Sequence, residues 1–316
     1  DELSGSQVNA IEKLTSLRCI DRTGLILSIF EQRAQTREAK AQVELARCEY
    51  ELPRLKGAWT HLERQGGGVG LRGGPGETQI EVDRRMIRTR ISQLKRELEH
   101  LERVRETQRQ GRPKGLPRVA LVGYTNAGKT SLLKALTGTG EPQDLLFATL
   151  DTTTRKAWLG ADTDPETGEG SGEPKHALVA DTVGFIRKLP HQLVAAFRST
   201  LGEVRTADAL IIVADAAHRE LEDQLKVVTA TLREIGCMDD QNLQPRLLVL
   251  NQVDRLHRPQ RLDLKKQFPG AVQTVALTGQ GVDEIRGWLR ELIPGPPKPR
   301  QMEWWELPEA TPASAS

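Results

Sequence analysis

The sequence is poor in cysteine, has no long apolar run and carries almost no net charge, and each absence excludes a class of protein. Its three cysteines among 316 residues, Cys19, Cys48 and Cys237, are too few and too far apart for a disulfide framework or a cysteine-based zinc site, so we expect a reducing compartment. No stretch of 18 apolar residues occurs, which rules out a membrane-spanning helix. The histidines are scattered and match no metal-binding spacing.

The chain does have the length of two or three domains and an uneven distribution of charge. Its formal charge of +2 divides at residues 111–117, a stretch rich in glycine and proline that is typical of a linker. Residues 1–115 hold 22 Lys and Arg against 17 Asp and Glu, a net +5, whereas the remainder holds 23 against 26, a net −3. Six basic residues and no acidic one lie from Arg84 to Arg96. Such density favours a polyanionic partner, and a solvated helix face is the equal alternative.

Two heptad patterns predict a helical hairpin in the first part of the chain. Apolar residues recur every three or four positions over residues 41–62, and a similar pattern covers residues 80–101. Each stripe would face water in an isolated helix, so we expect the two helices to pair in antiparallel orientation, with a kink at Pro53.

The residues before the hairpin predict the remnant of a small α/β domain. Residues 6–30 indicate a short helix, a short strand at residues 18–20 and a second helix from Thr23. Because the chain starts at Asp1 rather than Met, we expect an upstream segment, including any targeting signal, to have been removed.

Seven of the eleven residues from 66 to 76 are glycine, and Arg72 lies among them. A hairpin turn needs one or two glycines, whereas a backbone without side chains can approach another backbone or a base closely. We therefore predict RNA contact by this tip, residues 66–77, with a mobile loop as the compatible alternative. No strand precedes the glycines, so a dinucleotide-binding loop is rejected.

A phosphate-binding pattern opens the second part of the chain. The apolar run at residues 118–122 predicts a buried strand and leads directly into Gly123-Tyr-Thr-Asn-Ala-Gly-Lys-Thr130, where a helix should begin. Gly123 and Gly128 let backbone N–H groups surround phosphates. Lys129 neutralises charge on them, and Thr130 offers its hydroxyl to Mg²⁺.

Three shorter motifs follow, each at the expected end of a strand. In Asp-Thr-Val-Gly, Asp181 can reach Mg²⁺ through water and the Gly184 N–H can meet a γ-phosphate. In Asn-Gln-Val-Asp, Asp254 can accept from guanine N1 and N2, a donor pair that adenine lacks, and so selects GTP over ATP. The Ala276 N–H can donate to guanine O6. Each tetrapeptide alone fits an ordinary strand-end turn, but the ordered set predicts a P-loop GTPase domain, α/β in class and doubly wound, with a mostly parallel sheet.

The segment between the first two motifs should supply a second hydroxyl to Mg²⁺ and become ordered only with the γ-phosphate present. By position, the candidates are Thr149, Thr152, Thr153 and Thr154.

Together these motifs resemble the HflX-type GTPases, which split ribosomes, over residues 1 to 293. The most specific stretches are Arg72-Gly-Gly-Pro-Gly-Glu-Thr-Gln-Ile-Glu-Val-Asp-Arg-Arg85, Phe147-Ala-Thr-Leu-Asp151 and Asp181-Thr-Val-Gly-Phe-Ile-Arg187. The resemblance implies that Thr149 is the Mg²⁺-binding switch threonine. It also implies that the tip enters the peptidyl transferase centre of the large ribosomal subunit, among its rRNA.

Three departures from the family pattern resemble its mitochondrial branch. Gln252 replaces a lysine whose stem lies along the purine, which implies a lower nucleotide affinity, and Val275 replaces a serine. Residues 294–316 are too short for the extra C-terminal domain of some bacterial members. Because mitochondrial members act in ribosome recycling and large-subunit maturation, we expect a location in the mitochondrial matrix, with the cytoplasm as the alternative.

The expected domains are residues 1–115, an HflX-type N-terminal domain, residues 116–293, the GTPase domain, and a tail. We expect a GTP-hydrolysing factor that binds the large ribosomal subunit and its rRNA, splits or recycles ribosomes, is monomeric away from them and contacts no membrane. An assembly GTPase on immature large subunits is the alternative.

Phe185 cannot orient water, so hydrolysis should be slow without the ribosome. Asn126 either holds K⁺ near the phosphates or makes an ordinary loop hydrogen bond.

The candidate catalytic residues are Lys129, Thr149 and Gly184, and the candidate Mg²⁺ ligands are Thr130 and Thr149. The candidate nucleotide-binding residues are Gly123, Tyr124, Thr125, Asn126, Ala127, Gly128, Lys129, Thr130, Ser131, Phe147, Ala148, Thr149, Leu150, Asp151, Asp181, Thr182, Val183, Gly184, Asn251, Gln252, Val253, Asp254, Val275 and Ala276.

Overall fold

The chain divides into two compact units, one built mainly from residues up to Arg112 and the other mainly from Pro113 onward. The computed structural model describes residues 3–55, 79–110, 116–138, 152–160, 175–187, 198–238 and 244–292. The predicted tip at residues 66–77, the segment 147–151 and the tail at 294–316 lie outside the described residues. Among the helices in the described ranges, none is long and apolar enough to cross a membrane.

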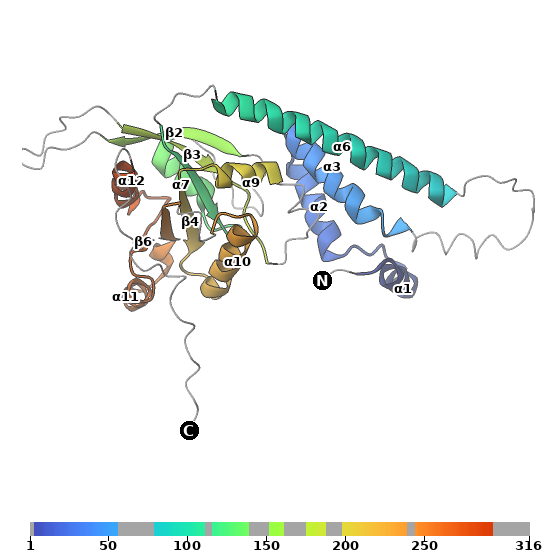
Figure 1. Ribbon diagram of the computed structural model, residues 1–316. Coiled ribbons are helices and arrows are strands. Elements are labelled where there is room, and N and C mark those ends of the chain that lie inside the picture. The colour runs from blue at the N-terminus through green and yellow to red at the C-terminus, as the bar shows by residue number, and fades with distance from the viewer. Residues whose placement is uncertain are drawn as a thin grey trace, which may run out of the picture. The chain divides into compact units, whose positions relative to one another are not determined.

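The first unit consists of helices in its described residues (Figure 1). Three of them start at a side-chain cap, because Ser4, Asp21 and Thr36 each accept from a backbone N–H of the following first turn. The helices are α1 (Gly5–Thr15), α2 (Arg22–Arg33), α3 (Arg37–Glu51) and α6 (Gln79–Gln110).

Helices α3 and α6 lie side by side, as the heptad patterns predict (Figure 1). Ala41 and Leu45 of α3 pack against Leu94 of α6 in a small buried cluster. Ion pairs flank this seam and run in antiparallel order: Glu38 pairs with Arg105 at 2.9 Å, and Glu49 with Lys95 at 2.9 Å. The antiparallel pairing is therefore confirmed for the described residues.

One expectation for this unit is wrong. Residues 18–20 form no strand, because the αL conformation of Ser16 ends α1, and the Cys19 N–H donates to Glu12 Oε1 at 2.8 Å instead of to a neighbouring strand. The described part of the unit is thus helical. Pro53 interrupts the first predicted helix: α3 ends at Glu51, residues 52–54 form a turn, and Leu55 is again helical, since proline offers no N–H and crowds the preceding turn. The rest of this predicted helix, residues 56–62, lies outside the described residues.

The second unit contains a six-stranded sheet in the order β2-β3-β1-β4-β5-β6. Adjacent strands are parallel except at one edge, where β2 runs antiparallel to β3. All seven residues of β4 are buried, as expected for a central strand covered on both faces. The strands are β1 (Arg118–Gly123), β2 (Thr153–Gly160), β3 (Lys175–Asp181), β4 (Ala209–Asp215), β5 (Arg246–Asn251) and β6 (Val272–Gln273).

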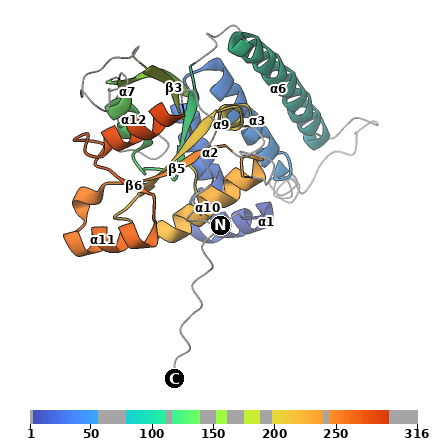
Figure 2. The same cartoon turned by 60° about the vertical axis from the view of Figure 1, so that its left-hand side comes forward.

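Helices cover both faces of this sheet (Figure 2). One apolar cluster joins α7 and α12 to one face, and a second joins α9, α10 and α11 to the other. The predicted doubly wound P-loop GTPase fold, with a mostly parallel sheet, is confirmed. The bounds are α7 (Lys129–Thr137), α9 (Arg198–Arg205), α10 (Leu221–Glu234), the 3₁₀ helix η1 (Val253–Arg255), α11 (Arg258–Gln267) and α12 (Val282–Glu291).

Candidate nucleotide-binding site

The predicted motifs meet at the carboxyl ends of the parallel strands. The phosphate-loop pattern follows β1, Asp181 ends β3, and Asn251 ends β5. Strand β1 lies between β3 and β4, so the loop after it is at the middle of this edge. In open α/β sheets this edge is where ligands bind.

Close packing explains the two glycines of the phosphate loop. A Cβ atom on Gly123 would lie 2.1 Å from the carbonyl oxygen of Val213 on the neighbouring strand β4. A Cβ atom on Gly128 would lie 2.2 Å from Asn251 Nδ2, and its φ of +91° is a conformation that favours glycine. The loop can therefore keep this path only with glycine at both positions.

Lys129 begins α7 and turns back over the loop that precedes it. Its side chain is buried, and Nζ donates to the carbonyl oxygens of Tyr124 at 3.0 Å and Gly123 at 3.3 Å. Burial lowers the pKa of Lys129 to about 8, and nearby Asp181 offsets part of this effect. A buried ammonium at this position suits charged phosphate oxygens.

Thr130 and Asp181 form the hydroxyl and carboxylate pair that the sequence places near Mg²⁺. Thr130 Oγ1 donates to Asp181 Oδ2 at 2.6 Å. The next residue, Thr182, is fully buried, and its Oγ1 donates to the Leu121 carbonyl at 2.7 Å. The described residues hold no group of three or more His, Cys, Asp or Glu that could by itself bind a metal ion. One hydroxyl and one carboxylate nevertheless fit Mg²⁺, which takes most of its other ligands from water and phosphate.

The loop after β3 contacts the phosphate loop through its backbone. The Thr125 N–H donates to the Phe185 carbonyl at 2.8 Å, and the Phe185 N–H donates to the Gly123 carbonyl at 3.0 Å. A Cβ atom on Gly184 would lie 2.8 Å from Thr125 Cα and 3.1 Å from Lys129 Nζ. Gly184 is thus placed against the phosphate loop, as its predicted γ-phosphate contact requires.

The Phe185 side chain faces the apolar core. It is 2% exposed and packs with Ala120 and Val122 of β1. This position agrees with the expectation that Phe185 does not orient a water molecule for hydrolysis.

Asn251 ties the base-recognition motif to two other loops. Its Nδ2 donates to the Ala127 carbonyl at 3.1 Å, and its Oδ1 accepts from the Ala276 N–H at 3.0 Å and from Thr274 Oγ1 at 3.2 Å. The Ala276 N–H, which we expected to meet guanine O6, is thus engaged with Asn251. Guanine O6 would share that donor or replace Asn251 as its acceptor.

The remaining predicted residues lie as follows. Asp254 is exposed within η1, whereas Val253 and Val275 are buried. Ser131 is partly buried in the first turn of α7. Residues 147–151, which include the predicted switch Thr149, lie outside the described residues. Thr153 and Thr154, two of the alternatives to Thr149, belong to strand β2, where Thr153 pairs with Asp181.

Sequence reasoning missed Thr274, Asp215 and Arg255. Thr274 precedes Val275 and bonds to Asn251. Asp215 follows an apolar run and ends β4, which is the signal that identified Asp181, and it pairs with Arg255 at 3.3 Å. Asp215 could have been found by treating any acidic residue that directly follows an apolar strand as a candidate site residue.

Comparison with known proteins also indicates a GTPase. Residues 118–252 match the family described as 50S ribosome-binding GTPase, residues 33–112 the family described as GTP-binding GTPase middle region, and residues 1–31 the family described as GTP-binding GTPase N-terminal. A crystal structure of SsGBP in complex with GDP is 27% identical, covers 93% of this chain and 79% of its own, and superposes with a TM-score of 0.51.

The curated relatives are longer than this chain. GTPase HflX of Magnetococcus marinus is 47% identical over 294 residues, which are 92% of this chain and 64% of the relative. GTPase HflX of Escherichia coli K12 is 46% identical over 297 residues, which are 93% and 66% of the two chains. The chain thus spans slightly less than two thirds of their length. Both relatives are bacterial, so the resemblance to the mitochondrial branch stays a prediction. The agreement of motifs, fold and sequence matches places the chain in the HflX family of GTPases.

Proposed function

We propose that the chain binds guanine nucleotides at the edge formed by β1, β3 and β5 and hydrolyses GTP there with Mg²⁺. The observation that carries this proposal is the contact of Asn251 with Ala127, because it joins the base motif to the phosphate loop at 3.1 Å. A nucleotide extends from base to phosphate, and its two recognition elements must be held at a fixed separation.

Side-chain and backbone groups of the site would bind different parts of the phosphates. Lys129 and the backbone N–H groups of the phosphate loop bind their oxygens, and Gly184 contributes its N–H to the γ-phosphate. Thr130 and, in our proposal, Thr149 present hydroxyls to the metal. Mg²⁺, when bound, would supply positive charge that offsets the charge of the phosphates. Asn126 lies exposed in this loop with a φ of +62°, and its role as a K⁺ ligand remains part of the proposal.

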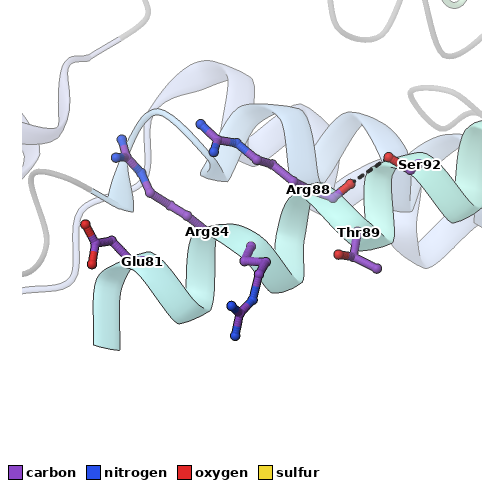
Figure 3. Close-up of a pocket in the computed structure, with 6 residues that line it drawn as sticks. Glu81, Arg84, Arg88, Thr89 and Ser92 are labelled. Atoms are coloured by element: carbon purple, nitrogen blue, oxygen red, sulfur yellow. Dashed lines mark hydrogen bonds between the residues drawn. The ribbon is translucent and has the colours of Figure 1, made fainter. Parts of the chain in front are cut away.

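The partner we propose is the large ribosomal subunit, and the basic start of α6 supports it. A pocket of about 520 Å³ lies there, lined by Glu81, Arg84, Arg85, Arg88, Thr89 and Ser92. Figure 3 shows Arg84 and Arg88 extending to the same side of the helix, as residues four apart do. Farther along α6, Arg90 and Lys95 pair with Glu44 and Glu49 of α3. Arg84 and Arg88 therefore offer positive charge to rRNA phosphates at this end of α6.

On this basis the protein would split or recycle ribosomes as a monomer in the mitochondrial matrix, with residues 66–77 in the peptidyl transferase centre. The GTP-bound form would fix the pose of the helical hairpin on the subunit, and hydrolysis would release it. Co-sedimentation with mature rather than immature large subunits would support recycling. Binding to immature subunits alone would favour the assembly function.

Base recognition provides the sharpest test of the nucleotide site. Asp254→Asn replaces an acceptor pair by an amide that can donate to the 2-carbonyl of xanthine. We expect the wild-type protein to bind GDP and not ADP, and the variant to prefer XDP. Asp263→Asn, an exposed change on α11, is the matched control. Equal binding of GDP and ADP by the wild-type protein would refute the proposed site.

A further inference from the structure

Four polar groups at the base-recognition motif are joined by an unbroken chain of hydrogen bonds, called the line below. Asp215 ends β4, Arg255 ends η1, Gln252 precedes η1, and the carbonyl of Asn126 belongs to the phosphate loop. Arg255 Nη1 donates to Asp215 Oδ2 at 3.3 Å and to Gln252 Oε1 at 2.7 Å. Gln252 Nε2 donates to the Asn126 carbonyl at 3.3 Å. The line runs from a carboxylate to the phosphate loop without a break.

The chemistry of the two ends fixes the orientation of the Gln252 amide. A guanidinium has only donors, so Arg255 must face the amide oxygen. The amide nitrogen then faces the Asn126 carbonyl, which can only accept. A charged donor on the oxygen also strengthens the N–H groups on the other side of the amide.

The line connects two residues with an unusual backbone. Among the described non-glycine residues, Ser16, Asn126 and Gln252 have a positive φ, and the last two are those that the Gln252 side chain joins. Such conformations cost free energy for side chains other than glycine, so the surrounding contacts must maintain them.

Asp254 lies within the stretch that this line holds. Gln252 lies just before η1 and Arg255 at its end, and the side chains of both bond to groups outside that turn. Fixing residues 252 and 255 therefore fixes the backbone that carries the Asp254 carboxylate.

We propose that Gln252 and Arg255 act as one positioning unit for guanine recognition, in which Arg255 orients the Gln252 amide. The proposal rests on the proposed nucleotide site and adds a residue to it. Asp215 anchors the unit: its side chain is 12% exposed, and its Oδ1 accepts from the Ala217 N–H at 2.9 Å.

The side chains of Gln252 and Arg255 are complementary, because the amide oxygen of the first accepts from the guanidinium of the second. A lysine at 252 would have no acceptor for Arg255 and would place a second cation beside it. Gln252→Lys should therefore conflict with Arg255, and the conflict should vanish when Arg255 is also removed.

A double-mutant cycle tests this coupling. We would measure the affinities for GDP and for IDP, which lacks the 2-amino group, in wild type, Arg255→Ala, Gln252→Lys and the double variant. Arg258→Ala is the control, since it removes an exposed arginine of the same charge in the next turn of chain. Thermal melting of each variant without nucleotide separates loss of fold from loss of recognition.

We expect Arg255→Ala to weaken GDP binding roughly three- to tenfold and to reduce the preference for GDP over IDP, because the pair is partly exposed. In the Gln252→Lys background the same change should be neutral or should strengthen binding. Equal losses in both backgrounds, or an unchanged GDP to IDP ratio in Arg255→Ala, would overturn the proposal while leaving the nucleotide site intact. A wild-type protein that binds no guanine nucleotide would overturn the proposed function and this inference with it.

Discussion

Thr130 Oγ1 donates to Asp181 Oδ2 at 2.6 Å, and this contact joins two motifs that lie 51 residues apart in the chain. The hydroxyl gives its only proton to the carboxylate, so in the proposed site its oxygen would meet Mg²⁺ through a lone pair. The pair links the start of α7 to the end of β3.

Replacing Thr130 by alanine should remove that ligand and leave Asp181 Oδ2 without its hydroxyl donor. We expect the gain in GTP affinity that Mg²⁺ brings to be at least tenfold smaller in the variant than in wild type. The free energy of unfolding should fall by about 1–3 kcal/mol. Titration of GTP with Mg²⁺ and with EDTA measures the first effect. Thr130→Ser should retain both properties. Thr137→Ala, whose hydroxyl donates to the Leu133 carbonyl, is the control on the same helix. Wild-type Mg²⁺ dependence in Thr130→Ala would contradict this role.

Gly184→Ala should disrupt the contact between the loop after β3 and the phosphate loop. The added methyl would lie 2.8 Å from Thr125 Cα, which is backbone and cannot move aside cheaply. We expect GTP hydrolysis to be lost and stability to fall by about 1–3 kcal/mol. In Gly287→Ala the new methyl would approach only Arg290 Nη2, at 3.9 Å, within α12, so this control should be neutral or slightly stabilising. Normal turnover by Gly184→Ala would exclude the proposed γ-phosphate contact.

The lowered pKa of Lys129 predicts a pH dependence of nucleotide binding. Below pH 8 the ammonium is already charged in the free protein, so its titration should not make GDP affinity depend on pH. Above a pKa of about 8 the free amine must take up a proton when it meets phosphate, and affinity should fall by up to tenfold per pH unit. Calorimetric titration at pH 8.5 in two buffers of different ionisation enthalpy measures that proton. Identical heats in the two buffers would show that Lys129 stays charged.

Charge reversal at the start of α6 tests the proposed RNA contact. The double variant Arg84→Glu with Arg88→Glu should bind large ribosomal subunits at least tenfold more weakly and with a smaller dependence on salt, because fewer counterions are released. The control is Arg258→Glu with Lys265→Glu on α11, which changes the charge equally in the second unit. If both double variants lose the same affinity, the effect is one of net charge and not of this pocket.

The sequence predicts the nucleotide fold well because its signals are local. Glycine at 123 and 128 and the residues at strand ends follow from short patterns, and the structure brings them to one edge of the sheet. Strand β2 was missed because its residues read as part of a switch segment, although Thr153 is held by pairing with Asp181. The contact of Arg255 with Asp215 was missed as well, since it needs the spacing of two strands that no local pattern encodes.

Turnover of GTP with and without large ribosomal subunits tests the central claim most directly. Phe185 is buried in the core and offers no group to the attacking water. The account therefore predicts slow hydrolysis by the protein alone and a rate at least tenfold higher with saturating large subunits, and it predicts that Gly184→Ala abolishes this increase. Equal rates with and without subunits would contradict it.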